Sequence, residues 1–328
     1  MMKKAAGQHR VTSADVARAC GVSRATVSYV LNNDPRQTIP PETRERILQA
    51  AQELGYSPFA PARLLRSGQS QLVLAVLPFE QIDPILSLYL KDLEQKLALH
   101  GLTLICYVGV HPQTGTLHPS THITPCVLLS YAAQDDPMIA DFLEQFHAPV
   151  LQLLGGASAQ EKIGEMQADY LIQRGRRSLI FLSLEREDIQ VIAQHRLRGV
   201  RQVCAQRGIA EPLVCTLPST REQARPVLRK ALATCAPPWG LCCYNDEVAL
   251  AALAVLADEK IPIPHAAAVI GCDNIPLARW SIPALTTIAF YDSGSLELLI
   301  ATIVALSRNE SAAWTSQRTL TLVQRASA

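Results

Sequence analysis

Beyond its first 70 residues, the chain alternates apolar runs with amphipathic stretches of helical length, and this alternation limits the possible folds more than any other feature. The run LVLAVLP at 72–78 precedes a helical segment at 84–100, and a second series runs from SLIFLSL at 178–184 to AAVIGCD at 267–273. Strands that are apolar throughout are typical of parallel sheets covered by helices on both faces. We therefore predict an α/β body of two Rossmann-like lobes, one for each series.

Open parallel sheets bind ligands in the crevice at the carboxyl ends of their strands. Two such lobes therefore predict a ligand site in the cleft between them. Further strands are expected at 102–108, 126–131, 150–154, 212–216, 240–245 and 318–324, and further helices at 138–146, 190–207, 221–234 and 247–259.

The stretch from Val11 to Leu31 has a different periodicity, which predicts two short helices joined by a tight turn. Thr12 is expected to cap the first helix together with Asp15. Gly21 allows the turn, and Ser23 is expected to cap the second helix. The polar face of that helix carries Arg24, Thr26, Ser28 and Tyr29. Such a helix suits insertion into the major groove of DNA, although the spacing alone also fits a helical hairpin in an ordinary bundle.

A third helix is predicted from about Pro41 to Leu54, where Gly55 ends it. The segment from Tyr56 to Ser70 is basic and interrupted by proline. It is either a plain linker or a hinge helix from about Ala60 to Arg66, too short to be stable alone in water. Such a helix would form beside a twin on DNA, where an apolar side chain could wedge between base steps of the minor groove.

The charge of the chain is unevenly distributed, although its net value is only +1. The first 70 residues hold ten Lys and Arg but five Asp and Glu, whereas the remainder holds 20 basic and 24 acidic residues. A basic head on a mildly acidic body indicates a module that contacts phosphates, carried by a nearly neutral partner domain.

Several classes of protein and site are disfavoured. The nine Cys lack CxxC spacing and His partners, which favours reduced thiols in a cytoplasm over disulfides or zinc. We find neither a signal segment nor an apolar run of membrane-spanning length. Phosphate-binding loops and catalytic motifs are also missing, so we expect no catalytic residue and no cofactor. His111, His118 and His122 share a polar loop without a rigid set of further ligands, so we expect no metal site.

The first 70 residues also carry a specific combination of short motifs. They are DVA at 15–17, GVS at 21–23, TVS at 26–28, VLNN at 30–33, TRERI at 43–47, LGYSP at 54–58 and ARLLRSG at 62–68. This combination resembles the DNA-binding head of the lactose/galactose repressor family of transcriptional regulators.

The resemblance implies a role for individual residues of the head. Arg24, Ala25 and Tyr29 match positions that read base edges, and Leu65 matches the intercalating leucine of the hinge helix. Tyr29 stands where the family usually has Arg or His, and it cannot make the bidentate contact of Arg to guanine. Specificity should therefore depend on Arg24 and on DNA deformability. The predicted DNA-binding residues are Thr12, Ser23, Arg24, Ala25, Thr26, Ser28, Tyr29, Asn32, Arg63 and Leu65.

The resemblance continues in the body, and it is strongest in the second half. It is carried by LIQRGRRSLIFL at 171–182, RLRGV at 196–200, YNDEVALAAL at 244–253, IPIPHAAAVIGCDNIPLA at 261–278 and PALTTI at 283–288. In the family this body is a periplasmic-binding-protein-like sensor, and the match implies effector contacts by Arg196, Asn245 and Asp273. A structural role is the alternative, in which Asp246 caps the following helix and Asp273 closes a turn.

The first half of the body departs from the family pattern. Asp83-Pro84-Ile85 replaces the usual Asn-Pro-Phe, and Gln160-Glu161 replaces the usual Asp-Asn. Asp83 is our fourth predicted effector contact, and its charge favours a ligand different from that of relatives. A regulator that has lost its ligand response is also consistent with these changes.

We therefore predict a cytoplasmic, homodimeric repressor that binds near-palindromic operator DNA and responds to a small ligand, a sugar or related polyol. The missing leucine-heptad tail favours a dimer over a tetramer. A sugar-binding transport protein would need a signal peptide, and a sugar kinase with a DNA-binding head would need a phosphate loop. The predicted domains are a helix-turn-helix head (1–58), a hinge helix or linker (59–70) and a body (71–328), with lobe one at about 71–158 and 290–311 and lobe two at about 159–289 and 312–328.

Overall fold

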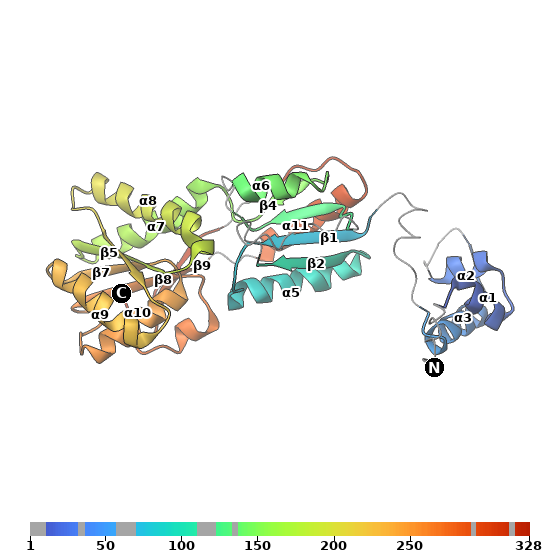
Figure 1. The fold of residues 1–328 in the computed structure, drawn as a ribbon, viewed down its shortest axis with the longest axis horizontal. Helices are drawn as coiled ribbons and strands as arrows, with labels where there is room; N and C mark the ends of the chain where they lie inside the picture. Colours follow the sequence, from blue (N-terminus) through green and yellow to red (C-terminus); the bar gives the residue numbers. More distant parts are fainter. Residues whose placement is uncertain are drawn as a thin grey trace, which may run out of the picture. The chain divides into compact units, whose positions relative to one another are not determined.

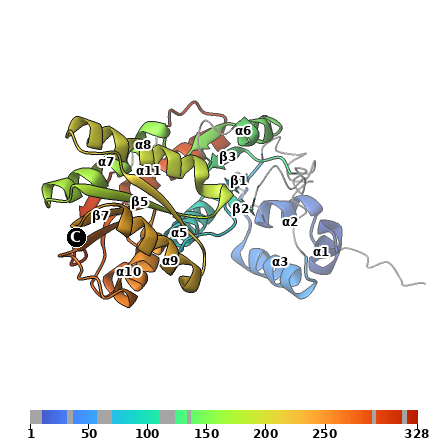
Figure 2. The same cartoon turned by 60° about the vertical axis from the view of Figure 1, so that its left-hand side comes forward.

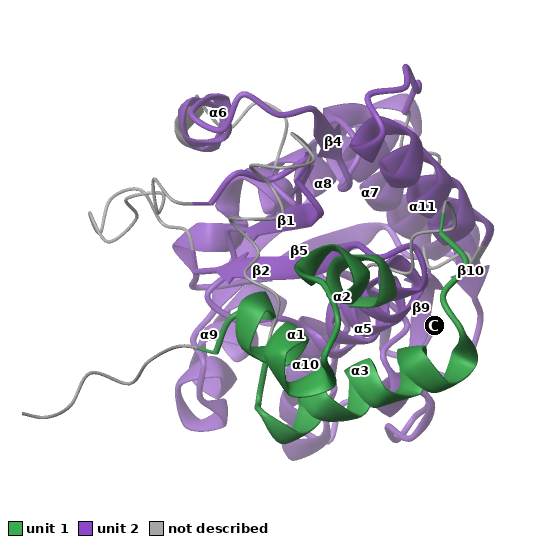
Figure 3. Ribbon diagram, turned by 90° about the vertical axis from the view of Figure 1, so that its right-hand side faces the viewer, with its two compact units in different colours: residues 1–69 green, residues 70–328 purple. Residues whose placement is uncertain are grey.

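The computed structural model describes residues 11–31, 37–56, 70–109, 123–132, 137–289, 293–314 and 319–328. The chain divides into two compact units, Met1–Gln69 and Ser70–Ala328 (Figure 3). We call the first unit the head and the second the body, and describe each by itself.

The head contains the three predicted helices, α1 (Ser13–Cys20), α2 (Arg24–Leu31) and α3 (Pro41–Glu53). The Asp15 carboxylate accepts hydrogen bonds from the Thr12 N–H (2.9 Å) and the Thr12 hydroxyl (2.7 Å), as expected at the start of α1. Gly21 ends α1 with φ of 62°, a left-handed conformation that favours glycine. The Ser23 hydroxyl accepts from the Thr26 N–H at 3.1 Å and so caps α2.

The core of the head is small. Val16 and Ala17 of α1, Val27 and Val30 of α2 and Ile47 of α3 are buried against one another. These contacts fix the angle between α1 and α2, which determines how α2 presents its polar face.

The body contains two sheets, each of which defines a lobe (Figure 1). We call lobe one the four-stranded sheet with α5, α6 and α11, and lobe two the six-stranded sheet with α7 to α10. Lobe one consists of β1 (Leu72–Leu77), α5 (Pro84–Leu99), β2 (Thr103–Val108), β3 (Val127–Ser130), α6 (Pro137–Glu144), β4 (Val150–Gln152) and α11 (Ser293–Ser307). Its strands are parallel, in the order β2-β1-β3-β4.

Lobe two has the strand order β10-β9-β8-β7-β5-β6. It consists of α7 (Ala157–Gln173), β5 (Ser178–Leu184), the 3-10 turn Glu187–Ile189, α8 (Gln190–Gln206), β6 (Leu213–Leu217), α9 (Arg221–Thr234), β7 (Trp239–Cys243), α10 (Asp246–Asp258), β8 (Ala267–Cys272), the 3-10 turn Pro276–Arg279, β9 (Thr286–Ala289) and β10 (Thr321–Val323). All pairs are parallel except β10 with β9, which is antiparallel.

Helices cover both faces of each sheet, as the apolar strands predict. Alternate residues of β1 point to opposite faces: Leu74 and Val76 pack toward Phe142 of α6, whereas Ala75 and Leu77 join the core that includes α5 and α11. In lobe two, α7 and α8 lie on one face of the sheet, and α9 and α10 lie on the other (Figures 1 and 2). The predicted two-lobed α/β fold is therefore confirmed.

Helix α7 was not among our predicted helices. It packs closely against α8, because a Cβ added to Gly164 of α7 would lie 1.9 Å from the Arg196 carbonyl oxygen of α8. Gly199 of α8 approaches the Glu161 carbonyl oxygen in the same way, at 1.9 Å. The two glycines thus allow a backbone approach that brings residues of α7 next to Arg196.

Candidate functional site

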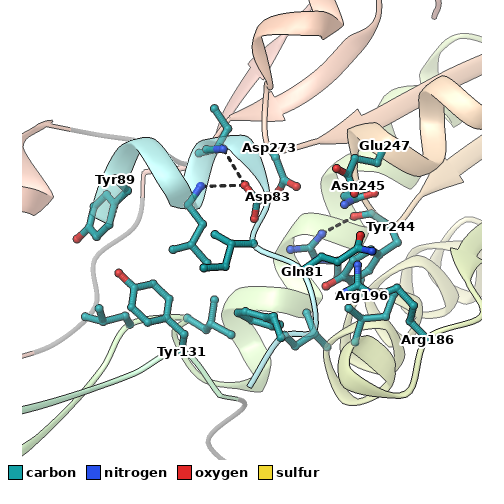
Figure 4. A pocket seen from close by; sticks show the side chains of 18 of the residues that line it. Gln81, Asp83, Tyr89, Tyr131, Arg186, Arg196, Tyr244, Asn245, Glu247 and Asp273 are labelled. Carbon is teal, nitrogen blue, oxygen red and sulfur yellow. Dashed lines mark hydrogen bonds between the residues drawn. The ribbon is translucent and has the colours of Figure 1, made fainter. Parts of the chain in front are cut away.

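The four predicted effector-binding residues line one pocket of the body. Asp83 precedes α5 of lobe one, whereas Arg196, Asn245 and Asp273 come from α8 and from the carboxyl ends of β7 and β8 in lobe two. Figure 4 shows these side chains gathered at one end of the pocket, with Tyr89 and Tyr131 at the other end. The pocket lies where parallel strands end, which is the usual ligand site of this architecture.

Arg196 is held in place by other residues of lobe two. Its Nε donates to the Gln160 side-chain oxygen at 3.0 Å, its Nη1 donates to the Tyr244 carbonyl oxygen, and its guanidinium lies 4.6 Å from the centre of the Tyr244 ring. Among the residues that the structure describes, no hydrogen bond engages Nη2. Gln160, at a position where the chain departs from the family pattern, thus orients the arginine.

Asn245 has the helix-capping role that the structural alternative assigns to its neighbour Asp246. Asn245 caps α10, because its side-chain oxygen accepts from the Val248 N–H at 3.0 Å. Asp246 is fully buried and accepts from the Ile275 N–H (2.9 Å) and the Thr287 hydroxyl (2.6 Å). The expectation that Asp246 caps the helix was wrong. The cap orients Asn245 and leaves its amide nitrogen as the donor at the pocket wall.

Asp273 lies directly after β8 in a left-handed conformation, with φ of 108°. Burial raises the pKa of its carboxyl group well above the ordinary value, and Asp83 also contributes to this increase, whereas Arg196 opposes it. A non-glycine residue held in this conformation is uncommon, and such strain is concentrated at functional sites.

Asp83 caps α5 in addition to lining the pocket. Its Oδ1 accepts from the Ile85 and Leu86 N–H groups, at 2.8 Å each (Figure 4). Both hydrogen bonds use one oxygen, so Oδ2 is the acceptor left for a ligand in the pocket. The pocket wall and the start of α5 therefore share one carboxylate.

Sequence reasoning missed several residues of the pocket. Arg186 and Tyr244 follow β5 and β7, so the strand-end rule could have found them. Glu247 lies in the first turn of α10, and Trp314 donates its indole N–H to the Gln152 carbonyl oxygen of β4 at 3.0 Å. No pattern in the sequence indicates that Trp314 reaches the pocket.

A hydrogen-bonded link connects the two lobes beside the pocket. Arg186 pairs with the buried Asp188 carboxylate, with Nε donating to Oδ1 at 3.0 Å. The Glu80 N–H of lobe one donates to Asp188 Oδ2 at 2.8 Å. Asp188 thus neutralises Arg186 and joins the segment after β1 to lobe two.

The second candidate site is the polar face of α2 in the head. Arg24 and Ala25 are exposed, and Thr26, Ser28 and Tyr29 are half-buried. The capping contacts of Thr12 and Ser23 described above show a structural use for these two side chains. Asn32, Arg63, Leu65 and the predicted hinge helix lie outside the described residues, so every DNA contact in the head stays a prediction.

Two negative findings apply to the described parts of the chain. There, no helix is long and apolar enough to cross a membrane. In the same residues, no group of three or more His, Cys, Asp or Glu is arranged to hold a metal ion. His111, His118 and His122 lie outside this part of the chain.

Comparisons with known proteins agree with this architecture. Residues 12–58 match the family model "Bacterial regulatory proteins, lacI family", and residues 168–328 match "Periplasmic binding protein-like domain". The chain is 27% identical over 305 residues to the HTH-type transcriptional repressor CytR of Escherichia coli (strain K12), covering 88% of this chain and 87% of the relative. It is 28% identical over 294 residues to the HTH-type transcriptional regulator GalS of Salmonella typhimurium, covering 85% of each.

Solved structures share the fold. The Lac repressor bound to ONPG in the repressed state superposes with a TM-score of 0.76 and 20% identity, covering 98% of this chain and 100% of that one. The Lac repressor dimer bound to operator and the anti-inducer ONPF gives a TM-score of 0.75 at 19% identity, covering 97% and 99%. The chain belongs to the lacI family of bacterial regulatory proteins and is a DNA-binding transcriptional regulator with a periplasmic-binding-protein-like body.

Proposed function

We propose that this regulator is a cytoplasmic repressor that binds near-palindromic operator DNA as a homodimer and changes its operator affinity when a small ligand enters the pocket of the body. The observation that carries the proposal is one chain that combines a helix-turn-helix head with a pocket in which residues of both lobes meet. A ligand that contacts both lobes binds the closed arrangement better than the open one. That difference in affinity is what a ligand-responsive switch requires.

The names of the relatives support the repressor reading, since CytR is named a transcriptional repressor and the Lac repressor structure contains operator DNA. A sugar-binding transport protein would not account for the head that matches the lacI family model over residues 12–58. An enzyme has no support in the comparisons, because the relatives are named as transcriptional regulators.

The purified full-length chain should bind a selected operator sequence with an affinity that falls steeply with salt. Arg24→Ala should weaken operator binding by about 1–3 kcal/mol and relax the preference at one base position, because Arg24 is exposed on α2 and is the polar side chain that we assign to base reading. Selection of binding sites from random DNA, followed by titration at several salt concentrations, measures both effects.

Arg18→Ala is the matched control, since Arg18 lies on α1 and pairs with Asp15 at 3.2 Å. It removes the same charge, so it should weaken all sequences similarly and leave the base preference unchanged. An affinity that does not change with salt would refute DNA binding, and an unchanged site profile for Arg24→Ala would refute its role as a reader.

Dimerisation has a candidate surface in lobe two. Leu277, Trp280 and Ile282 lie within a span of six residues that begins five residues after β8. They are 61%, 77% and 91% exposed, an unusual concentration of apolar surface for a monomer. We propose that this apolar segment packs against a second copy of the chain. Trp280→Glu should therefore weaken the dimer by about tenfold or more in sedimentation equilibrium. Val214→Glu, at an exposed position of the edge strand β6, should not weaken it, and equal loss would refute the assignment.

A further inference from the structure

The polar end of the pocket contains more negative than positive charge. Its carboxylates are Asp83, Glu247 and Asp273, and its cations are Arg186 and Arg196. Arg186 is already paired with Asp188, whose side chain is fully buried. One guanidinium, that of Arg196, therefore shares this end of the pocket with three carboxyl groups, and two of them stay charged when Asp273 is protonated.

This charge distribution discriminates between ligands. A phosphate or carboxylate group would lie against like charges in a partly buried site, and such placement is strongly unfavourable. Hydroxyl and amino groups, in contrast, would donate to the carboxylate oxygens, while Arg196 and the Asn245 amide nitrogen could donate to ring and hydroxyl oxygens. The polar end thus suits an uncharged or cationic ligand with many donors.

The other end of the pocket is apolar and aromatic. Tyr89 and Tyr131 lie there (Figure 4), and Leu153 lies beside Tyr131 because its N–H donates to the Ser130 carbonyl oxygen at 2.9 Å. Trp314 also lines the pocket and contacts β4 next to Leu153. Trp314 donates its N–H to the Gln152 carbonyl oxygen, so the ring offers the pocket its apolar surface. A free sugar held at the polar end would leave this wall without a partner, whereas a planar apolar group attached to the sugar would cover it.

We propose that the effector is an uncharged or cationic glycoside that carries a planar apolar aglycone, such as a nucleoside or an aryl glycoside, and not a free sugar, a sugar phosphate or a sugar acid. This inference rests on the proposed function, because it assumes that the pocket binds the effector. It goes further by assigning the sugar to the end with Asp83, Arg196 and Asp273, and the aglycone to the end with Tyr89 and Tyr131 (Figure 4).

Matched series of probes test the proposal on the full-length protein by calorimetry. The nucleoside series is adenosine and cytidine, ribose, and the two 5′-monophosphates. The aryl series consists of the 4-nitrophenyl glycosides of glucose and galactose, the two free sugars, and the 6-phosphates of the two glycosides. In at least one series the glycoside should bind about tenfold or more tightly than both the free sugar and the phosphate. A phosphate or free sugar that binds as tightly, or no binding by any probe at about 10 mM, overturns the proposal.

Two variants assign the ends of the pocket. Trp314→Ala should reduce the affinity of the best glycoside toward that of its free sugar, while Val214→Ala, at an exposed position of the edge strand β6, serves as the control and should have no effect. Glu247→Gln should reduce the ratio of the affinity for the glycoside to the affinity for its phosphate. Unchanged ratios in both pocket variants, each shown to be folded by thermal unfolding, would refute the assignment.

Failure of this inference is distinguishable from failure of the proposed function. Operator binding is measured without any probe, so a protein that binds operator but none of the glycosides refutes the ligand class alone. A protein that binds a glycoside but no DNA refutes the repressor function and leaves the ligand class intact.

Discussion

The two lobes of the body supply different halves of the pocket. In lobe two, Arg196 is fixed by Gln160 and by the Tyr244 carbonyl oxygen, and Asn245 is fixed by its capping bond. In lobe one, the wall is mainly apolar, and its charged side chain, Asp83, also caps a helix. Lobe two therefore holds its polar groups in position without a ligand, whereas the contribution of lobe one depends on where α5 begins.

This difference indicates how ligand affinity is divided. Groups that are fixed before binding lose little conformational freedom when the ligand arrives, so lobe two should supply most of the specific recognition. Lobe one adds a mainly apolar surface, and the Glu80 N–H bond to Asp188 joins it to lobe two beside the pocket. Three substitutions test this division, from the largest expected effect to the smallest.

Gly164→Ala should have the largest effect, because the new methyl group would collide with the Arg196 backbone oxygen at 1.9 Å. We expect the free energy of unfolding of the body to decrease by about 3 kcal/mol, since overpacked helix contacts cannot relax cheaply. Gly101→Ala in lobe one is the control: its φ is 75° and no atom lies within 4 Å of the new Cβ, so we expect a loss of about 1 kcal/mol. Urea unfolding measures both, and equal losses would contradict the special role of the α7–α8 contact.

Asp246 should make the stability of lobe two depend on pH. Burial raises the pKa of its carboxyl group from 3.8 to about 6, so between these values the folded protein keeps a proton that the unfolded chain releases. The free energy of unfolding should therefore decrease as pH rises from about 4 to about 6, by at most about 3 kcal/mol. Asp246→Asn should remove this part of the decrease.

The control for Asp246 is Asp258→Asn. A hydrogen bond from Arg221 lowers the pKa of the Asp258 carboxyl group, so this variant should leave the decrease between pH 4 and pH 6 in place. Burial raises the pKa of Asp273 in the same direction as that of Asp246, and the difference between the variants isolates Asp246. Identical pH profiles for the wild type and Asp246→Asn would contradict the assignment.

Asp83 tests lobe one and should have the smallest effect on stability. Asp83→Ala removes the acceptor of the Ile85 and Leu86 N–H groups and should lower the unfolding free energy by about 1 kcal/mol. Asp83→Asn keeps a capping oxygen, so it should change thermal stability by only a few tenths of a kcal/mol. A loss of unfolding free energy as large as that of Gly164→Ala would show that lobe one tolerates substitution as poorly as lobe two.

The fold was largely predictable because strands that are apolar throughout indicate a sheet that is buried on both faces. Helix α7 was missed because it buries polar residues: Gln167 is fully buried and donates to the carbonyl oxygens of Cys243 and Gly271, at 2.8 and 3.0 Å. Such side chains interrupt the apolar period, and only the neighbouring strands reveal that their hydrogen bonds are satisfied inside.

The site was predictable where position in a strand is sufficient, as for Asp273 after β8. The roles of Asn245 and Asp246 were not predictable, because both residue types are good helix caps and the sequence alone does not show which of them caps α10. Their roles are decided by Thr287 of β9, which donates to Asp246 across 41 positions of the chain. Trp314 reaches the pocket through Gln152, 162 positions away, a contact that no local pattern encodes.

The double use of Asp83 has a mechanical consequence. Helix α5 has 16 residues, and at 1.5 Å per residue it is a rod about 24 Å long. It begins at a carboxylate in the pocket and ends at Leu99, which is 85% exposed, and Lys96 near that end pairs with Glu297 of α11. Because a helix bends little over this length, a displacement of Asp83 by a fraction of an ångström must be accompanied by a displacement at Leu99. The pocket wall at Asp83 and the exposed surface around Leu99 are therefore the two ends of one rigid element.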